Sequence, residues 1–173
     1  MEVLARIAEE KIVPVIKLDS PEYALPLADA LSAGKINVAE VTFRTATAAE
    51  SIKILSRERP DLLVGAGTVL TLSQLDEAIA AGARFVVSPG FNPVIVEACI
   101  KRGVPITPGV NNPSLVEMAM QMGLEVLKFF PAELSGGVKM LKTLGSVYPA
   151  KFMPTGGLDE ANVLDYLRLE NVI

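Results

Sequence analysis

The sequence predicts an α/β protein, a (β/α)8 TIM barrel, from two observations. Seven short apolar, β-rich runs recur along the 173 residues, and helix-type segments separate them. The runs cover residues 12–16, 37–43, 62–67, 85–89, 104–109, 126–131 and 151–157. Near-continuous apolar runs are typical of parallel strands that helices cover on both faces. Strand and helix thus alternate, and residues 1–173 are predicted to form a single TIM-barrel domain.

Two architectures fit such an array, an open doubly wound sheet and a closed (β/α)8 barrel. A doubly wound sheet usually carries a glycine-rich fingerprint after its first strand. Here residues 16–22 read IKLDSPE, without a glycine. The seven evenly repeated units therefore favour the barrel.

The eighth βα unit of that barrel is missing from the sequence, so the predicted domain is C-terminally incomplete. A seventh helix, roughly residues 159–169, leads into ENVI at 170–173, where an eighth strand should begin. Either the natural chain continues, by about 30 to 40 residues for a minimal barrel, or the barrel is open with two exposed edges that invite aggregation. The first alternative is preferred.

Helix starts and ends carry their own sequence signals. Capping residues followed by Pro, or by an acidic or amide side chain three positions later, occur at Ser20–Pro21, Thr47 with Glu50, Thr71 with Gln74, Asn92–Pro93 and Asn112–Pro113. Glycines that suit the left-handed position just after a helix are Gly34, Gly82, Gly103 and Gly123.

Composition excludes several function classes. With 16 Lys+Arg against 20 Asp+Glu, the formal charge of −4 argues against a nucleic-acid or anionic-membrane surface. The absence of histidine excludes Ser-His-Asp and Cys-His nucleophile systems and H-E-x-x-H zinc sites. Catalysis must therefore use Lys, Asp, Glu, Tyr or a hydroxyl. No metal site is expected, because the sequence offers no His, no Cys pair and no acid cluster as ligands.

The remaining composition signals concern compartment. Cys99 is the only cysteine and lies in an apolar helix pattern, so we expect a buried thiol. Residues 1–13 lack the apolar region of a signal peptide. The longest apolar run, LLVGAGTVL at 62–70, is far shorter than the ~20 residues of a membrane helix. A cytoplasmic location is therefore expected.

Lys128 is the first candidate for chemistry, because function in a barrel lies at the carboxyl ends of the strands. It stands inside the apolar run VLKFFP at 126–131. Burial there would disfavour the charged ammonium and leave a nucleophilic amine. The alternative is a lysine whose stem packs while its head reaches water.

Glu40 is the second candidate, an acid in the middle of NVAEVTF. Strand side chains alternate, so Glu40, Thr42 and Arg44 share one face. That face would offer a general acid/base with a guanidinium for a carboxylate at its end. The alternative is an internal Glu40–Arg44 ion pair that only satisfies two buried charges.

Two glycine-containing turns complete the candidates. GAGTV at 65–69 lets a ligand or a neighbouring backbone approach closely, and Thr68 there could bond a substrate oxygen. PTGG at 154–157 places Thr155, Gly156 and Gly157 between the seventh strand and its helix, where barrels often bind phosphate. A plain βα turn is the alternative reading of the second motif.

Taken together, these residues closely resemble the 2-keto-3-deoxy-6-phosphogluconate (KDPG) aldolase family, also called 4-hydroxy-2-oxoglutarate aldolases. The matching segments are EVTFRT (40–45), VGAGTV (64–69), SPG (88–90), PGV (108–110), KFFPAE (128–133), GGVK (136–139) and PTGG (154–157). They occur in the family's order and at its spacing over almost the whole sequence.

The resemblance implies a class I aldolase, a lyase that forms a lysine imine and uses no cofactor, and a cytoplasmic homotrimer. It makes Lys128 the Schiff-base lysine and Glu40 the proton shuttle. Arg44 and Thr68 match the pyruvate-carboxylate site, and Thr155, Gly156 and Gly157 match the phosphate-binding turn. Pro89 is a further candidate for binding substrate. The implied partners are a 2-keto acid and a phosphorylated aldehyde.

Two departures from the family and several rival functions stand beside this reading. The family's eighth-strand Gly-Gly-Ser segment, which completes the phosphate site, is absent, and Lys35 replaces a glycine after a helix. The rivals are a related 2-keto-3-deoxy-6-phosphogalactonate aldolase, a phosphate-binding barrel isomerase and a non-catalytic oligomerising scaffold. The sequence leaves the preferred aldehyde half and the C4 stereochemistry open.

Overall fold

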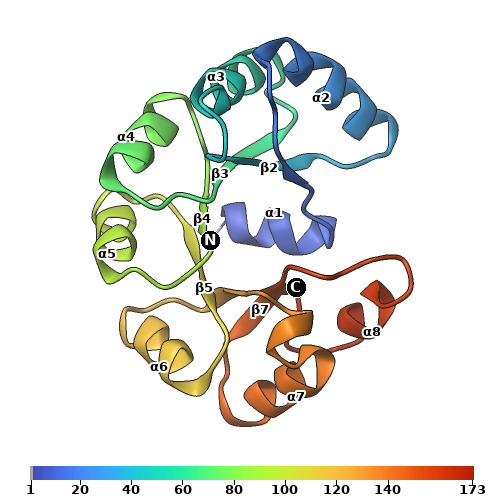
Figure 1. The fold of residues 1–173 in the computed structure, drawn as a ribbon, viewed down its shortest axis with the longest axis vertical. Coiled ribbons are helices and arrows are strands. Elements are labelled where there is room, and N and C mark those ends of the chain that lie inside the picture. The colour runs from blue at the N-terminus through green and yellow to red at the C-terminus, as the bar shows by residue number, and fades with distance from the viewer. Residues whose placement is uncertain (1) are drawn as a thin grey trace. The chain divides into compact units, whose positions relative to one another are not determined.

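The computed structural model describes residues 2–173, which divide into two compact units. The first unit comprises residues 2–88 and 93–106, and the second comprises residues 89–92 and 107–173. Figure 1 shows helices and strands alternating along the chain within each unit. The α/β class predicted from the sequence is confirmed, and all seven described strands are in parallel ladders.

The first unit holds four strands and five α-helices. Its elements are α1 (Glu2–Glu10), β1 (Val15–Ile16), the 3-10 turn η1 (Pro21–Tyr23), α2 (Ala24–Ala33), β2 (Val38–Thr42), α3 (Ala48–Glu58), β3 (Leu63–Gly67), α4 (Leu72–Ala80), β4 (Val86–Ser88) and α5 (Pro93–Lys101). Strand β2 lies between β1 and β3, with Glu40 opposite Val15 on one side and Gly65 on the other. Strand β3 also pairs in parallel with β4, with Ala66 opposite Val86.

The second unit contains all but the first residue of β5 (Ile106–Val110), followed by α6 (Pro113–Gln121), β6 (Val126–Phe129), η2 (Glu133–Ser135), α7 (Gly137–Val147), β7 (Lys151–Pro154) and α8 (Val163–Leu167). Strand β6 pairs with β5 and β7, so Lys128 lies between Gly109 and Met153. A parallel bridge joins Phe152 to Val172, within the segment predicted to begin an eighth strand.

A hydrophobic core forms in the second unit between its strands and helices. Leu127, Phe129 and Phe152 are each 0% exposed and belong to one cluster with side chains of α6, α7 and α8. The rings of Phe129 and Phe152 meet edge to face at 6.5 Å. Because strand residues alternate, this packing directs Leu127 and Phe129 to the helix side and Lys128 to the opposite face.

Three predicted helix caps are confirmed by hydrogen bonds. The Ser20, Thr71 and Asn112 side chains accept from the amides of Glu22, Gln74 and Leu115 at 3.3, 3.2 and 3.1 Å. They supply acceptors for N–H groups that the first turn of a helix leaves unpaired.

The predicted capping box at Thr47 is wrong. The Thr47 hydroxyl donates instead to the carbonyl of Leu18 at 2.7 Å, and Thr45 donates to the same carbonyl at 2.8 Å. Both threonines thus tie the segment after β2 to the segment after β1, and this tertiary contact replaces the local cap.

Two further helix-end predictions need correction. Gly82, Gly103 and Gly123 have the expected positive φ, but Gly34 has φ −80° and Lys35 takes the left-handed position at φ 59°. The predicted helix at 159–169 is shortened to Val163–Leu167. Asp159 accepts from the amides of Ala161 and Asn162, and this local turn competes with helix formation.

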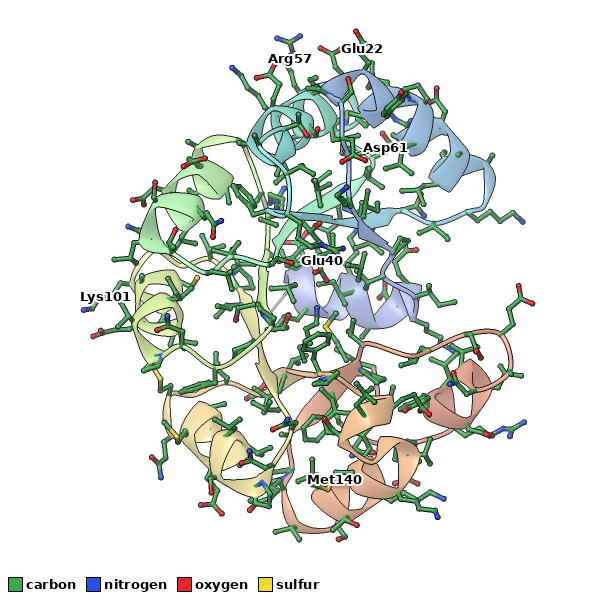
Figure 2. All side chains as sticks on the ribbon, in the orientation of Figure 1. Glu22, Glu40, Arg57, Asp61, Lys101 and Met140 are labelled. Carbon is green, nitrogen blue, oxygen red and sulfur yellow. The ribbon has the colours of Figure 1, made fainter. Side chains whose placement is uncertain are left out.

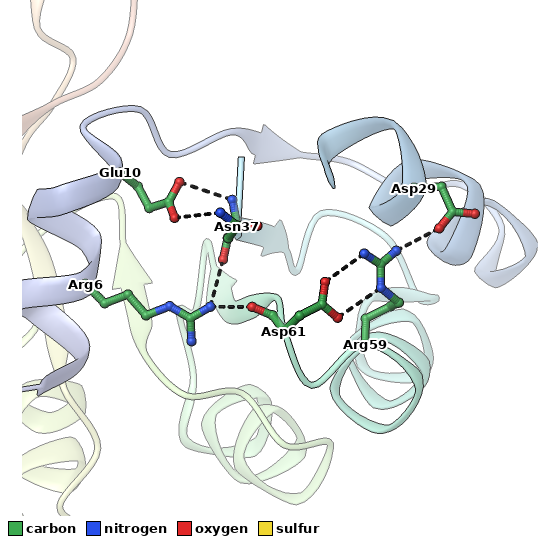
Figure 3. A network of polar contacts seen from close by, with 6 residues as sticks. All are labelled: Arg6, Glu10, Asp29, Asn37, Arg59 and Asp61. Atoms are coloured by element: carbon green, nitrogen blue, oxygen red, sulfur yellow. Dashed lines mark hydrogen bonds and ion pairs between the residues drawn. The ribbon is translucent and has the colours of Figure 1, made fainter. Parts of the chain in front are cut away.

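Helix α1 is held at the amino ends of β2 and β3 by a polar network (Figure 3). The Arg6 guanidinium donates to the carbonyls of Asn37 and Asp61, and the Glu10 carboxylate accepts from the amide and side chain of Asn37. Arg59 extends the network through ion pairs to Asp29 and Asp61, both at 2.8 Å. No helix within residues 2–173 is long and apolar enough to cross a membrane.

Candidate active site

Glu40 is buried on β2, with 2% of its surface exposed. Figure 2 shows its side chain among the interior side chains, whereas Glu22, Arg57 and Lys101 project outward from their elements. A carboxylate is costly to bury unless neighbouring groups compensate its charge, so this position is a candidate for chemistry.

Two glycines of β3 make room on the Glu40 face. A Cβ at Gly67 would overlap the Glu40 carboxylate, and a Cβ at Gly65 would overlap the Phe85 ring. The two glycines of the GAGTV motif thus have a steric explanation, because only glycine leaves space for the Glu40 carboxylate at position 67 and for the Phe85 ring at position 65.

Arg44 is held by a chain of hydrogen bonds at the carboxyl end of β2. Its Nε donates to Thr42 Oγ1 at 3.1 Å, and the Thr42 hydroxyl donates to the Ile16 carbonyl at 2.8 Å. The Glu40–Arg44 ion pair that the sequence left open is not formed between these two described side chains. Arg44 is exposed, and the terminal nitrogens of its guanidinium take no part in the bond to Thr42.

Thr68 directly follows β3 in an unusual backbone conformation. Its φ of 56° lies in the left-handed region, which β-branched residues rarely adopt. The residue is half-buried, beyond the carboxyl end of the strand next to Glu40. Backbone strain of this kind clusters at active sites and ligand-binding positions, so Thr68 remains a candidate.

Lys128 is buried on β6, with 6% of its surface exposed. Its Nζ lies 5.4 Å from the centroid of the Phe130 ring. The burial predicted from VLKFFP is confirmed, and the lysine occupies the face opposite the core cluster. Its side chain is therefore largely shielded from solvent.

Pro89 lies against β5, the strand that pairs with the Lys128 strand β6. A Cβ at Gly109, the residue opposite Lys128 on β5, would overlap the Pro89 carbonyl. Close approach of these backbones requires glycine at position 109, which explains the glycine of the PGV motif.

The turn at 155–157 is held through all three of its carbonyls. The Ala132 amide donates to Thr155 O at 2.8 Å, the Glu133 amide to Gly156 O at 3.1 Å, and Asn162 Nδ2 to Gly157 O at 2.9 Å. In a trans peptide the C=O and the next N–H point in opposite directions. The amides of Gly156 and Gly157 therefore point away from these donors, and no acceptor within residues 2–173 binds either of them.

The sequence interpretation missed two features of the second unit. Thr107 on β5 is 1% exposed, and its hydroxyl has no hydrogen-bond partner among the described residues. Thr107 lies two residues before Gly109, the residue opposite Lys128, so the two-residue period of a strand places Thr107 on the Lys128 face. This spacing could have identified Thr107 from the sequence. The second feature is a hydrogen bond from the Tyr166 hydroxyl to Glu133. No local sequence pattern predicts it, because 33 residues separate the two partners.

The structure thus gathers the candidates in two groups, each within one unit. Glu40, Arg44 and Thr68 lie at or just after neighbouring strands of the first unit, and Lys128, Pro89 and residues 155–157 belong to the second. Cys99 is buried as predicted, and burial raises the pKa of its thiol to about 11. No group of three or more acidic or cysteine side chains within residues 2–173 could hold a metal ion.

Comparisons with known proteins converge on one family. A family model described as KDPG and KHG aldolase matches residues 3–173. The 2-dehydro-3-deoxy-phosphogluconate aldolase of Haemophilus influenzae is 50% identical over 99% of this chain and 82% of its own length. The KHG/KDPG aldolase of Escherichia coli K12 is 44% identical over 94% of this chain and 76% of its own length.

A solved structure supports the same relationship. KDPG aldolase from Legionella pneumophila, with pyruvate captured as a covalent carbinolamine, matches with a TM-score of 0.90 and 46% identity. The match covers 92% of this chain and 78% of that one.

Proposed function

The chain belongs to the KDPG and KHG aldolase family and is a class I aldolase, a lyase, and we propose that Lys128 and Glu40 carry its chemistry. The reaction cleaves 2-keto-3-deoxy-6-phosphogluconate to pyruvate and glyceraldehyde 3-phosphate, and 4-hydroxy-2-oxoglutarate to pyruvate and glyoxylate. The observation that carries the proposal is the burial of Lys128, 6% exposed, on the strand face away from the core cluster.

Lys128 acts as the nucleophile. Its neutral amine attacks the C2 ketone to give a carbinolamine, and loss of water gives a protonated imine. The imine accepts the electron pair of the C3–C4 bond as that bond breaks, and the aldehyde leaves. The resulting enamine is protonated at C3, and water then hydrolyses the imine to release pyruvate and the free amine.

Glu40 moves the protons of these steps. The carboxylate takes the proton from the C4 hydroxyl as the C3–C4 bond breaks, and the acid returns a proton to the enamine carbon. Arg44 and Thr68 hold the substrate carboxylate, because a guanidinium offers paired donors to two carboxylate oxygens. Pro89 contributes its backbone beside the lysine strand.

Thr155, Gly156 and Gly157 bind the phosphate. Support comes from the two consecutive amides directed away from the groups that hold the turn, since backbone N–H groups of this kind bind anions. The 4-hydroxy-2-oxoglutarate substrate carries no phosphate, so this turn would affect only the phosphorylated substrate.

We propose further that residues 1–173 belong to one (β/α)8-barrel domain of a cytoplasmic homotrimer. Two observations support this proposal: the seven sequence motifs resemble those of the aldolase family, and the structure has seven parallel strands within residues 2–173. Light scattering of the purified protein should give three times the chain mass, and cell fractionation should recover the enzyme with the soluble cytoplasmic proteins.

Pyruvate exchange tests the proposal against its rivals. The enzyme should exchange the methyl protons of pyruvate with deuterium from solvent, because the enamine forms without any aldehyde. Lys128→Met should abolish exchange, and Lys139→Met, which removes an exposed lysine of α7, should preserve it. An isomerase or a scaffold would show no exchange in the parent enzyme. Comparison of the gluconate and galactonate substrates then separates the two related aldolases.

A further inference from the structure

The turn at 155–157 takes its shape from the segment that directly follows the Lys128 strand. Two of its three carbonyls accept from the consecutive amides of Ala132 and Glu133, at 2.8 and 3.1 Å. Any movement of residues 132–133 therefore changes the direction in which the amides of Gly156 and Gly157 point. The orientation of this turn depends on what fixes Glu133.

The Glu133 side chain lies directly against the turn. A Cβ at Gly157 would come within 2.7 Å of Glu133 Cγ and 2.8 Å of its Cβ. Glycine at 157, with φ 81°, thus permits both the backbone conformation and the close approach of the glutamate.

Tyr166 anchors the far end of the same glutamate. The tyrosine is 1% exposed, its ring belongs to the core cluster of the second unit, and its hydroxyl donates to Glu133 Oε1. Burial, followed by the hydrogen bond and the charge of Glu133, raises the pKa of the Tyr166 phenol. The phenol therefore keeps its proton and remains a donor at neutral pH.

Gly137 provides the space in which the two side chains meet. A Cβ there would lie 3.1 Å from both Glu133 Oε1 and Tyr166 Oη. The GGVK motif, which has no part in the imine chemistry, thus serves this contact between η2 and α8.

We propose that Glu133 and Tyr166 are positioning residues that aim the Gly156 and Gly157 amides at the substrate phosphate. The inference rests on the phosphate assignment made under the proposed function. The core fixes Tyr166, Tyr166 fixes the Glu133 carboxylate, and Glu133 supports the turn through its side chain and its amide. The pair determines selectivity for phosphorylated substrates without touching the reacting carbons.

Two matched aldehydes test the proposal. Condensation of pyruvate is measured with glyceraldehyde 3-phosphate and with glyceraldehyde, which differ only in the phosphate. Tyr166→Phe keeps the ring and removes the donor, so the ratio of the two kcat/KM values should fall about tenfold, through KM for the phosphorylated aldehyde. The control Tyr148→Phe removes a 2.7 Å hydrogen bond to Glu117 in the same unit and should leave the ratio unchanged.

A second pair of variants separates positioning from folding. Glu133→Gln keeps an oxygen that can accept from Tyr166 and should stay within about threefold of the parent ratio, whereas Glu133→Ala should lose about tenfold. Equal losses with both aldehydes would overturn the proposal, because general damage does not select for phosphate. Equal ratios for Glu133→Gln and Glu133→Ala would also overturn it.

The failure of the phosphate assignment has a separate signature. A parent enzyme that uses both aldehydes equally would overturn the phosphate site and, with it, the positioning role. A parent that prefers the phosphorylated aldehyde, with Tyr166→Phe no different from Tyr148→Phe, would overturn the positioning role alone.

Discussion

The two ends of β2 and β3 carry polar residues arranged in opposite ways. At the amino ends, Arg6, Glu10 and Asn37 bond to one another or to backbone carbonyls, and Arg59 pairs with Asp61 (Figure 3). Toward the carboxyl ends, the buried Glu40 carboxylate lies against Gly67, and Thr42 holds Arg44 by one nitrogen.

Under the proposed function, the difference separates residues that stabilise the fold from residues that carry the chemistry, within one unit. A side chain whose hydrogen-bonding groups are met by protein partners stabilises the fold and has little left to offer a substrate. The hydrogen bond from Arg44 Nε to Thr42 leaves the terminal donors of the guanidinium unused. The positive φ of Thr68 is a strained conformation of the kind that clusters at ligand-binding positions. Substitutions at the two ends should therefore change different measured quantities.

The largest effect is expected at Glu40. Glu40→Gln keeps the shape of the side chain and loses proton transfer, so kcat should fall by roughly 10² or more. Glu50→Gln, an exposed acid on α3, serves as the control. Steady-state cleavage assays measure both, and a Glu40→Gln enzyme nearly as fast as the parent would reduce Glu40 to a structural residue.

Gly67→Ala tests whether the space around Glu40 is essential. The added Cβ would overlap the carboxylate and displace it, so kcat should fall by roughly 10- to 10²-fold, the scale of a misplaced catalytic group. Gly34→Ala, where φ is −80°, is the matched control. Activity retained in Gly67→Ala would mean that the position of Glu40 tolerates movement.

Arg44→Lys should weaken pyruvate binding more than turnover. An ammonium cannot form the two-pronged contact of a guanidinium, and it also loses the Nε bond to Thr42, so KM for pyruvate should rise about tenfold. The exposed Arg57→Lys should leave KM unchanged. A fall in kcat alone would place Arg44 outside the carboxylate site.

At the amino ends, Asp61→Asn should alter stability and not catalysis. The hydrogen bond from Arg59 is the main cause that lowers the pKa of Asp61. A lowered folded-state pKa contributes stability above the ordinary aspartate pKa of about 3.9 and loses it as pH falls through the folded value. The variant should therefore melt below the parent at pH 7, with a gap that closes under more acidic conditions. Thermal melts across pH check this, and an unchanged gap would contradict the pairing.

Much of the fold could be predicted because apolar runs and turn residues are local signals. All seven strands were found, and the burial of Lys128 and Glu40 followed from their apolar neighbours. Thr47 and Gly34 were misassigned because tertiary contacts and a neighbouring Lys35 at φ 59° replaced the local preference. The support of the 155–157 turn by Glu133 and Tyr166 could not be predicted, because it joins segments far apart in sequence.

The identity of the imine-forming lysine is the central claim, and borohydride trapping with pyruvate tests it most directly. Reduction of the imine fixes the three-carbon unit on the nitrogen that formed it, and peptide mass mapping locates the adduct. The burial of Lys128 on the face opposite the core cluster predicts a single adduct on Lys128. An adduct on Lys17, Lys139 or Lys142 instead would contradict the account.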